Sequence, residues 1–270
     1  MAYVFDHQWK QERERLASME ALLDPFTIDC LEAMGVAEGW RCLEVGAGGG
    51  SIAEWLCRRV GPTGKVVATD LETKFIAALA APNVEVRKHD IRQDALEEAA
   101  YDLIHARKVL EHLAEPHAAL VRMSAAVKPG GWLFVEDVDF ASFLKLEARD
   151  PEFFKRAFGQ FVQTMQQAGF QPYLGRELGQ WLRALGYEQV RVEGRTVEGT
   201  GHGTHPSATL WRLTMTKLRE RVVQQGRLTD AEVEQFMTDF QSPDFHALSA
   251  IGFAAWGCKP TALSDLQIRT

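Results

Sequence analysis

Apolar and polar positions follow two different periods along the first half of the chain. Short apolar runs that end in acids or turn residues predict buried strands at residues 41–46, 65–70, 84–90, 101–106 and 131–138. Between them, apolar residues at helical spacing predict helices at residues 50–60, 73–80 and 116–127. Such an alternation of strand and helix is typical of a parallel sheet with helices on both faces.

The segments on either side of this core are mainly helical in pattern. Residues 7–35 carry apolar side chains at helical spacing, and Pro25 is expected to break the run. The part after Asp139 predicts helices at 151–168, 174–185, 206–225 and 229–240, with strands at 187–197 and 248–257. We expect the additional helices to cover one edge of the sheet as a lid.

The most specific local pattern lies at the end of the first strand. There Leu43-Glu44-Val45 runs directly into Gly46-Ala47-Gly48-Gly49-Gly50, and a helical pattern begins at Ser51. A strand, a glycine-rich turn and a helix form a nucleotide-type pocket, because glycine allows a sharp turn and lets a ligand lie against bare main chain.

Two classes of cofactor compete for this pocket. The dinucleotide pattern G-x-G-x-x-G, counted from Gly46, would place its third glycine where this chain has Ser51. The carboxylate of Glu44 is a poor neighbour for a pyrophosphate and a good one for an ammonium group. S-adenosylmethionine carries an ammonium, a sulfonium and no phosphate, so the charge of the loop favours it over NAD.

Two further acids support a nucleoside ligand. Asp70 ends the second strand, where a carboxylate can accept hydrogen bonds from both ribose hydroxyls of either cofactor. Asp90 ends the third strand, where it could accept from an adenine amino group while Ile91 lies against the ring. Because dinucleotide folds have no standing need for an acid there, Asp90 favours S-adenosylmethionine.

Several short patterns occur in a fixed order over roughly residues 40–140. They are Glu44 to Gly50, Asp70, His89-Asp90-Ile91, Tyr101 to Arg107, Leu110-Glu111-His112-Leu113 and Val127-Lys128-Pro129-Gly130-Gly131. In these patterns the chain resembles the class I S-adenosylmethionine-dependent methyltransferases that act on small molecules. An ordered set of this kind is far more specific than the glycine loop alone.

The resemblance implies an α/β fold with a doubly wound, mostly parallel, seven-stranded Rossmann-like sheet whose last strand is antiparallel. A helical lid would come from the N-terminus and from insertions after strands five and six. We expect one methyltransferase domain over residues 1–270, divided into an N-terminal helical cap at 1–38, a cofactor-binding core at 39–140, lid insertions interleaved with strand six at 141–245, and the last strand at 246–258.

The motifs also imply the cofactor contacts. These fall on Glu44, Gly46, Ala47, Gly48, Asp70, Leu71, Asp90, Ile91 and Arg107. Arg107 follows the fourth strand, beside the expected methionine end of the cofactor, although an ion pair with a nearby acid would explain it equally well.

Methyl transfer from a sulfonium needs mainly positioning and the exclusion of water. A general base is required only when the acceptor arrives protonated. The candidates are His112 after the fourth strand, Asp139 at the end of the fifth strand, and His202 in the glycine-rich stretch after strand six. Each has a structural alternative: a local hydrogen bond for His112, a helix cap or an ion pair for Asp139, and a mobile lid loop for His202.

Composition narrows the class of partner. The chain of 270 residues has a net charge of −7 and no basic run, so no nucleic-acid partner is expected. No carboxylate or cysteine accompanies His202 and His205 locally, so no metal site is expected either. No apolar run is long enough to span a bilayer, and no signal peptide opens the chain. The cysteines Cys30, Cys42, Cys57 and Cys258 are widely spaced, which suits reduced thiols in a cytoplasmic protein. A homodimer is compatible with the chain, but no residue pattern argues for one.

These observations predict a methyltransferase that acts on an oxygen, nitrogen or carbon atom of a small molecule. Aromatic residues in the predicted lid, such as Phe154, Phe158 and Phe161, suggest a partly apolar acceptor such as a secondary metabolite. One alternative keeps the fold and the cofactor but performs cyclisation or decarboxylation without transferring a methyl group. A second alternative is an NAD(P)-dependent oxidoreductase.

Overall fold

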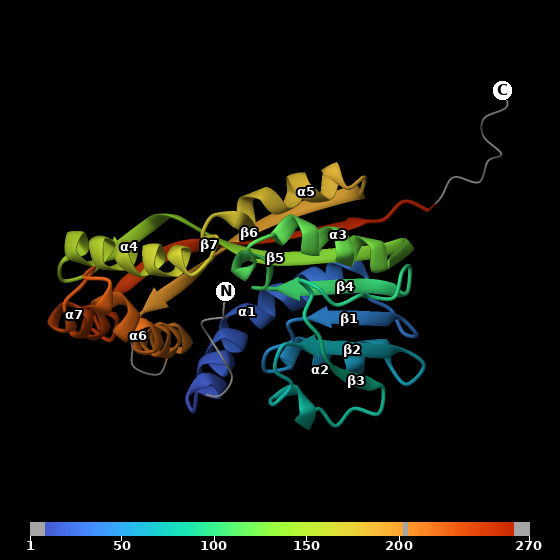
Figure 1. The fold of residues 1–270 in the computed structure, drawn as a ribbon, viewed down its shortest axis with the longest axis horizontal. Helices are drawn as coiled ribbons and strands as arrows, with labels where there is room; N and C mark the ends of the chain where they lie inside the picture. Colours follow the sequence, from blue (N-terminus) through green and yellow to red (C-terminus); the bar gives the residue numbers. More distant parts are fainter. Residues whose placement is uncertain (1–8, 202–204, 262–270) are drawn as a thin grey trace.

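The computed structural model describes residues 9–201 and 205–261. Within these residues the centre of the molecule is a seven-stranded sheet of order β3-β2-β1-β4-β5-β7-β6 (Figure 1). The strands are β1 Arg41–Val45, β2 Lys65–Asp70, β3 Val84–Lys88, β4 Tyr101–Arg107, β5 Val127–Glu147, β6 Glu188–Thr200 and β7 His246–Cys258. Strands β1 to β5 pair in parallel, whereas β7 is antiparallel to β5 and to β6. The predicted fold class is therefore confirmed.

Helices cover both faces of this sheet. They are α1 Glu12–Met34, α2 Ser51–Val60, α3 Pro116–Ala126, α4 Pro151–Gln167, α5 Leu178–Ala184, α6 Pro206–Gln224 and α7 Asp230–Phe240. Short 3-10 turns lie at η1 Ile76–Ala78, η2 Leu110–His112 and η3 Leu174–Glu177. One core packs α1 and α2 on the sheet, and a second packs α3 and α5 on the opposite face.

The fifth strand is much longer than its apolar run predicts. Instead of ending near residue 138, β5 continues to Glu147, paired with β7 as far as His246. Its far half has a core of its own, because Phe140 and Leu146 pack against buried aromatics from α4 and α7. The helices α4, α6 and α7, which belong to the segment predicted as a lid and are called the lid below, pack on an extension of β5, β6 and β7 at one end of the molecule (Figure 1).

Two helical predictions were wrong. The helix expected at 73–80 is reduced to the single turn η1, in which Ile76 alone is buried. Conversely, Pro25 does not break α1, which runs without interruption from Glu12 to Met34. Phe26, Cys30 and Leu31 are buried immediately after the proline, so tertiary packing compensates for the missing backbone hydrogen bond.

Pro25→Ala is expected to raise the free energy of unfolding by about 1 to 2 kcal/mol. Pro25 is exposed within the helix, so alanine restores a backbone donor without disturbing a buried contact. Urea unfolding measures the change. Pro151→Ala is the matched control, because Pro151 lies at the start of α4, where a backbone N–H has no partner within the helix. Equal effects of both substitutions would contradict this explanation.

Candidate active site

A cavity of about 300 Å³ lies at the carboxyl edge of the parallel strands, between α1 and the lid. The side next to the glycine loop is lined by Val45, Gly46, Gly48, Asp70, Leu71, His89, Asp90 and Ile91. Its lid side is lined by Phe140, Met165, Phe170, Leu210, Trp211, Thr214, Phe240 and Phe245. One continuous space thus joins the glycine loop to an aromatic chamber.

The glycine loop presents bare main chain to this cavity. Gly46 and Gly48 have φ angles of +68° and +57°, in the left-handed region that favours glycine. A side chain at Gly46 would place its Cβ 2.5 Å from Cγ2 of Val109. At Gly48 the nearest atom, Cδ2 of Leu16, would be 3.6 Å away, so a side chain there would occupy the cavity instead of clashing with its wall.

Asp70 joins the end of β2 to this loop. The Gly48 N–H donates to Oδ2 of Asp70 at 2.9 Å, and the Glu72 N–H donates to Oδ1 at 3.1 Å. Asp70 and Leu71 both line the cavity. The carboxylate therefore holds the loop in shape while it faces the space where a nucleoside would lie.

Asp90 also lines the cavity, but its carboxylate is already paired. Nε and a terminal nitrogen of Arg92 donate to it at 2.7 and 2.6 Å, and this guanidinium lowers the pKa of Asp90. Ile91 is buried beside it in the cavity wall. An acceptor for an adenine amino group is thus present in its ionised form.

Glu44 does not line the cavity, and neither does Ala47. The Oε2 atom of Glu44 lies 2.7 Å from Nδ1 of His105, and Nε2 of His105 lies 2.9 Å from Oε1 of Glu136. Burial disfavours a charged imidazole, but the two carboxylates outweigh this and raise the pKa of His105 to about 9. Of the two carboxylates that flank His105, Glu136 lines the cavity and Glu44 does not.

Arg107 ties α1 to the sheet. Its guanidinium donates to Oγ1 of Thr27 and to Oδ1 of Asp24, both at 2.7 Å. It also lines the cavity, so the ion-pair explanation of Arg107 is confirmed, and its contact with the cofactor stays a prediction.

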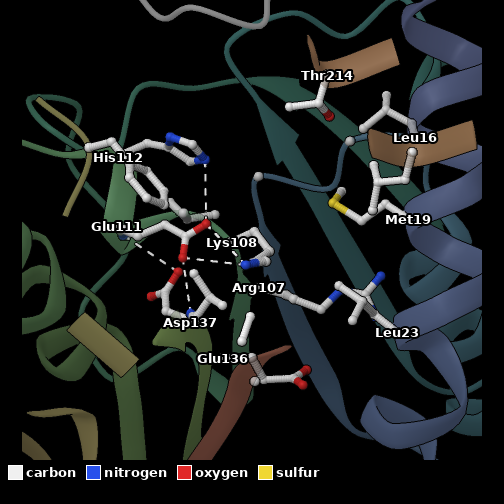
Figure 2. Close-up of a pocket in the computed structure, with 18 of the residues that line it drawn as sticks. Leu16, Met19, Leu23, Arg107, Lys108, Glu111, His112, Glu136, Asp137 and Thr214 are labelled. Carbon is white, nitrogen blue, oxygen red and sulfur yellow. Dashed lines mark hydrogen bonds and ion pairs between the residues drawn. The ribbon is translucent and has the colours of Figure 1, made fainter. Parts of the chain in front are cut away.

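Four polar side chains gather in the cavity wall, three that follow β4 and one from the middle of β5: Lys108, Glu111, His112 and Asp137 (Figure 2). Glu111 is their centre: its carboxylate accepts from the Val138 N–H at 3.0 Å and lies 3.2 Å from Nζ of Lys108 and 3.6 Å from Nε2 of His112. Lys108 has a φ of +59°, a strained value for a residue with a side chain. Such strain is typical of residues held in place at functional sites.

Burial shifts the protonation of this cluster. It lowers the pKa of His112 to about 4, so the ring is neutral at physiological pH. Burial, reinforced by the charge of Glu111, raises the pKa of Asp137 well above its usual range. His112 is thus a weak base in this setting, while Asp137 has gained basicity.

The three catalytic residues predicted from the sequence differ in their position relative to the cavity. His112 lies in the cavity wall. Asp139 lies outside it and accepts from Nε of Arg176 at 2.5 Å and from the Ala141 N–H at 2.8 Å, as its structural alternative predicted. His202 lies outside the described residues. Asp137 occupies the place expected for Asp139, and the only sequence signal for it was its place next to the expected end of the fifth strand.

Comparison with known proteins identifies the family. A family profile described as a methyltransferase domain matches residues 6–192, more than half of the chain. The chain belongs to this methyltransferase family. The class I S-adenosylmethionine-dependent methyltransferase resemblance of its motifs is thereby confirmed, and the oxidoreductase alternative loses its support.

Individual relatives agree with this assignment. Methyltransferase str2 of Strobilurus tenacellus is 31% identical over 69% of this chain and 67% of its own length. The ubiquinone biosynthesis O-methyltransferase of Leptothrix cholodnii is 26% identical over 70% of this chain and 81% of its own length. Phosphoethanolamine N-methyltransferase 2 of Haemonchus contortus shares the fold, with a TM-score of 0.61 at 14% identity over 96% of this chain and 60% of its own.

The residues of this methyltransferase fit the cofactor of its family. Gly46 and Gly48 line the cavity without side chains, and the carboxylates of Asp70 and Asp90 lie in the same wall, where hydroxyl and amino groups of a nucleoside would need acceptors. Among residues 9–201 and 205–261, no three His, Cys, Asp or Glu side chains are grouped as a metal site. Within the same residues, every helix is too short or too polar to cross a bilayer.

Proposed function

We propose that this methyltransferase methylates a hydroxyl oxygen of a small, partly apolar molecule held under the lid. The observation that carries the proposal is the single cavity that connects the glycine loop and Asp70 with aromatic walls from β5, α6, α7 and the segment after α4. The similarity to an enzyme named as an O-methyltransferase supports oxygen as the acceptor atom.

The residues of the cavity wall would mainly position the cofactor and the acceptor. Bound S-adenosylmethionine supplies an electrophilic methyl group on its sulfonium. The main chain at Gly46 and Gly48, together with Asp70 and Asp90, would hold the nucleoside end. Phe140, Phe170 and Trp211 supply apolar surface that orients the acceptor and excludes water, which is the main requirement of an in-line displacement.

A hydroxyl acceptor must lose its proton, and Asp137 has the chemistry to take it. Its carboxylate lies in the cavity wall beside Glu111, and its raised pKa gives it the basicity of an effective general base. Lys108, which is paired with Glu111, lines the same cavity, where its ammonium group would stabilise the developing oxyanion.

Asp137→Asn is expected to lower kcat by about 10²- to 10⁴-fold, the range of a general base. In the wild type, kcat should rise with pH as Asp137 ionises, since only its unprotonated form accepts a proton. The variant should lose this rise but keep its affinity for S-adenosylmethionine. The assay follows transfer of a labelled methyl group to a panel of phenols and catechols, with aliphatic amines as the contrast.

Asp139→Asn is the matched control, because this carboxylate lies outside the cavity wall. Wild-type turnover of amines alone would contradict the oxygen assignment. Conversion of an acceptor without gain of a methyl group would favour the non-methylating alternative. Binding of NADH without binding of S-adenosylmethionine would overturn the proposed cofactor.

A further inference from the structure

The row Glu44–His105–Glu136 crosses three adjacent strands inside the sheet. Glu44 of β1 lies opposite His105 of β4, and Glu136 comes from β5. All three side chains are buried, with His105 fully enclosed and its ring 4.7 Å from that of Phe134. Each ring nitrogen has its own carboxylate partner, at 2.7 and 2.9 Å. Because both nitrogens face acceptors, the ring is held as an imidazolium.

This row leaves an unbalanced negative charge at the cavity. The cationic side chains of the cavity wall each have an acidic partner: Arg15 with Glu12, Arg92 with Asp90, Arg107 with Asp24, and Lys108 with Glu111. The row instead has two carboxylates for one imidazolium. The row therefore carries a net negative charge, and Glu136 is its member that lines the cavity.

Other titratable groups on this face of the sheet come from neighbouring elements. Burial raises the pKa of Cys30 on α1 to about 12, so its thiol is neutral at physiological pH. Arg195 of β6 is paired with Asp29 of α1. Arg107 lies opposite Glu136 in the β4–β5 register but is paired with Asp24, whereas Nε2 of His105 lies 2.9 Å from Glu136.

We propose that His105 is a positioning residue that holds Glu136 as an anion in the cavity wall, where it favours the sulfonium of S-adenosylmethionine over the neutral thioether of S-adenosylhomocysteine. This inference rests on the proposed function. Its consequence is a cavity that prefers the methyl donor to the spent cofactor. A carboxylate attracts a cationic ligand strongly here because the surrounding apolar walls screen charge poorly.

Removal of the ring has a specific consequence for pH dependence. Without an imidazolium between them, two buried carboxylates on neighbouring strands repel each other, and one takes up a proton. With the ring present, the pKa of His105 near 9 keeps the row in one charge state from pH 6 to pH 8. A purely structural role of His105 predicts a loss of stability, but no new pH dependence of ligand preference.

Calorimetric titration with S-adenosylmethionine and with S-adenosylhomocysteine tests the inference. In Glu136→Gln, the preference for S-adenosylmethionine should fall by roughly tenfold, the effect of one charge in a poorly screened site. In His105→Gln, the preference should be reduced at pH 6 and recover towards pH 8 as the carboxylate ionises. Wild-type preference should stay level over the same range.

Two variants serve as matched controls. Glu147→Gln removes an exposed carboxylate further along β5, and His117→Gln removes an exposed imidazole on α3. Both should keep the wild-type preference. If His105→Gln does not fold, Glu136→Gln decides alone. An unchanged preference in Glu136→Gln overturns the inference, whereas a wild-type chain that binds neither ligand overturns the proposed function instead.

Discussion

Asp70→Ala is expected to weaken the binding of S-adenosylmethionine by about 100-fold or more, the loss of two hydrogen bonds to a charged group. The carboxylate has two roles that the substitution removes together. It faces the nucleoside side of the cavity, and it accepts from the N–H groups of Gly48 and Glu72, which hold the loop against the end of β2. Calorimetric titration measures the affinity.

The fold should survive this change, because Asp70 lies at the rim of the sheet and not in its core. Far-ultraviolet circular dichroism and a thermal melt check this. Asp70→Asn keeps one carbonyl oxygen for the loop and should show an intermediate loss. Glu54→Ala, on the exposed face of α2, is the control and should bind like the wild type. A similar affinity in Asp70→Ala and Glu54→Ala would place the cofactor elsewhere.

Gly48→Val tests the same pocket from its other side. A valine side chain would project into the cavity, and the positive φ angle of the glycine would strain it. This variant should share the loss of binding seen in Asp70→Ala, while the loop hydrogen bond to Asp70 is retained.

Phe154→Ala is expected to lower the free energy of unfolding by about 3 to 5 kcal/mol, the cost of truncating a fully buried aromatic residue. Phe154 lies at the centre of the lid core, completely buried. Its ring centroid is within 4.9 Å of those of Phe236, Phe240 and Phe245. The substitution would open a cavity where α4, α7 and the approach to β7 meet.

Guanidinium unfolding, followed by tryptophan fluorescence and by circular dichroism, measures this effect. Phe153→Ala is the matched control: its residue is adjacent on α4 but only partly buried, so its cost should be clearly smaller. Should the two probes give different midpoints, the lid unfolds separately from the sheet. Equal costs for Phe153→Ala and Phe154→Ala would contradict the packing seen in the lid core.

Sequence patterns were most successful where a short segment sets its own structure. The glycine loop, the alternation of strands with helices, and the boundaries of α2, α3, α6 and α7 all depend on local periodicity and turn chemistry. Predictions failed where distant contacts decide. Pro25 remains inside α1 because the residues after it are buried, and β5 extends far beyond Val138 because the lid packs on it.

The amino-acid sequence by itself therefore determined the fold class, the family and the candidate cofactor-binding residues Gly46, Gly48, Asp70 and Asp90. Tertiary structure alone decided which acids reach the cavity. It turned Glu44 towards His105, paired Asp139 with Arg176, and brought Glu136 and Asp137 to the wall. The physical reason is that a buried carboxylate must pair with a counter-charge or a hydrogen-bond donor. Those partners come from other strands and helices, which a local sequence pattern does not specify.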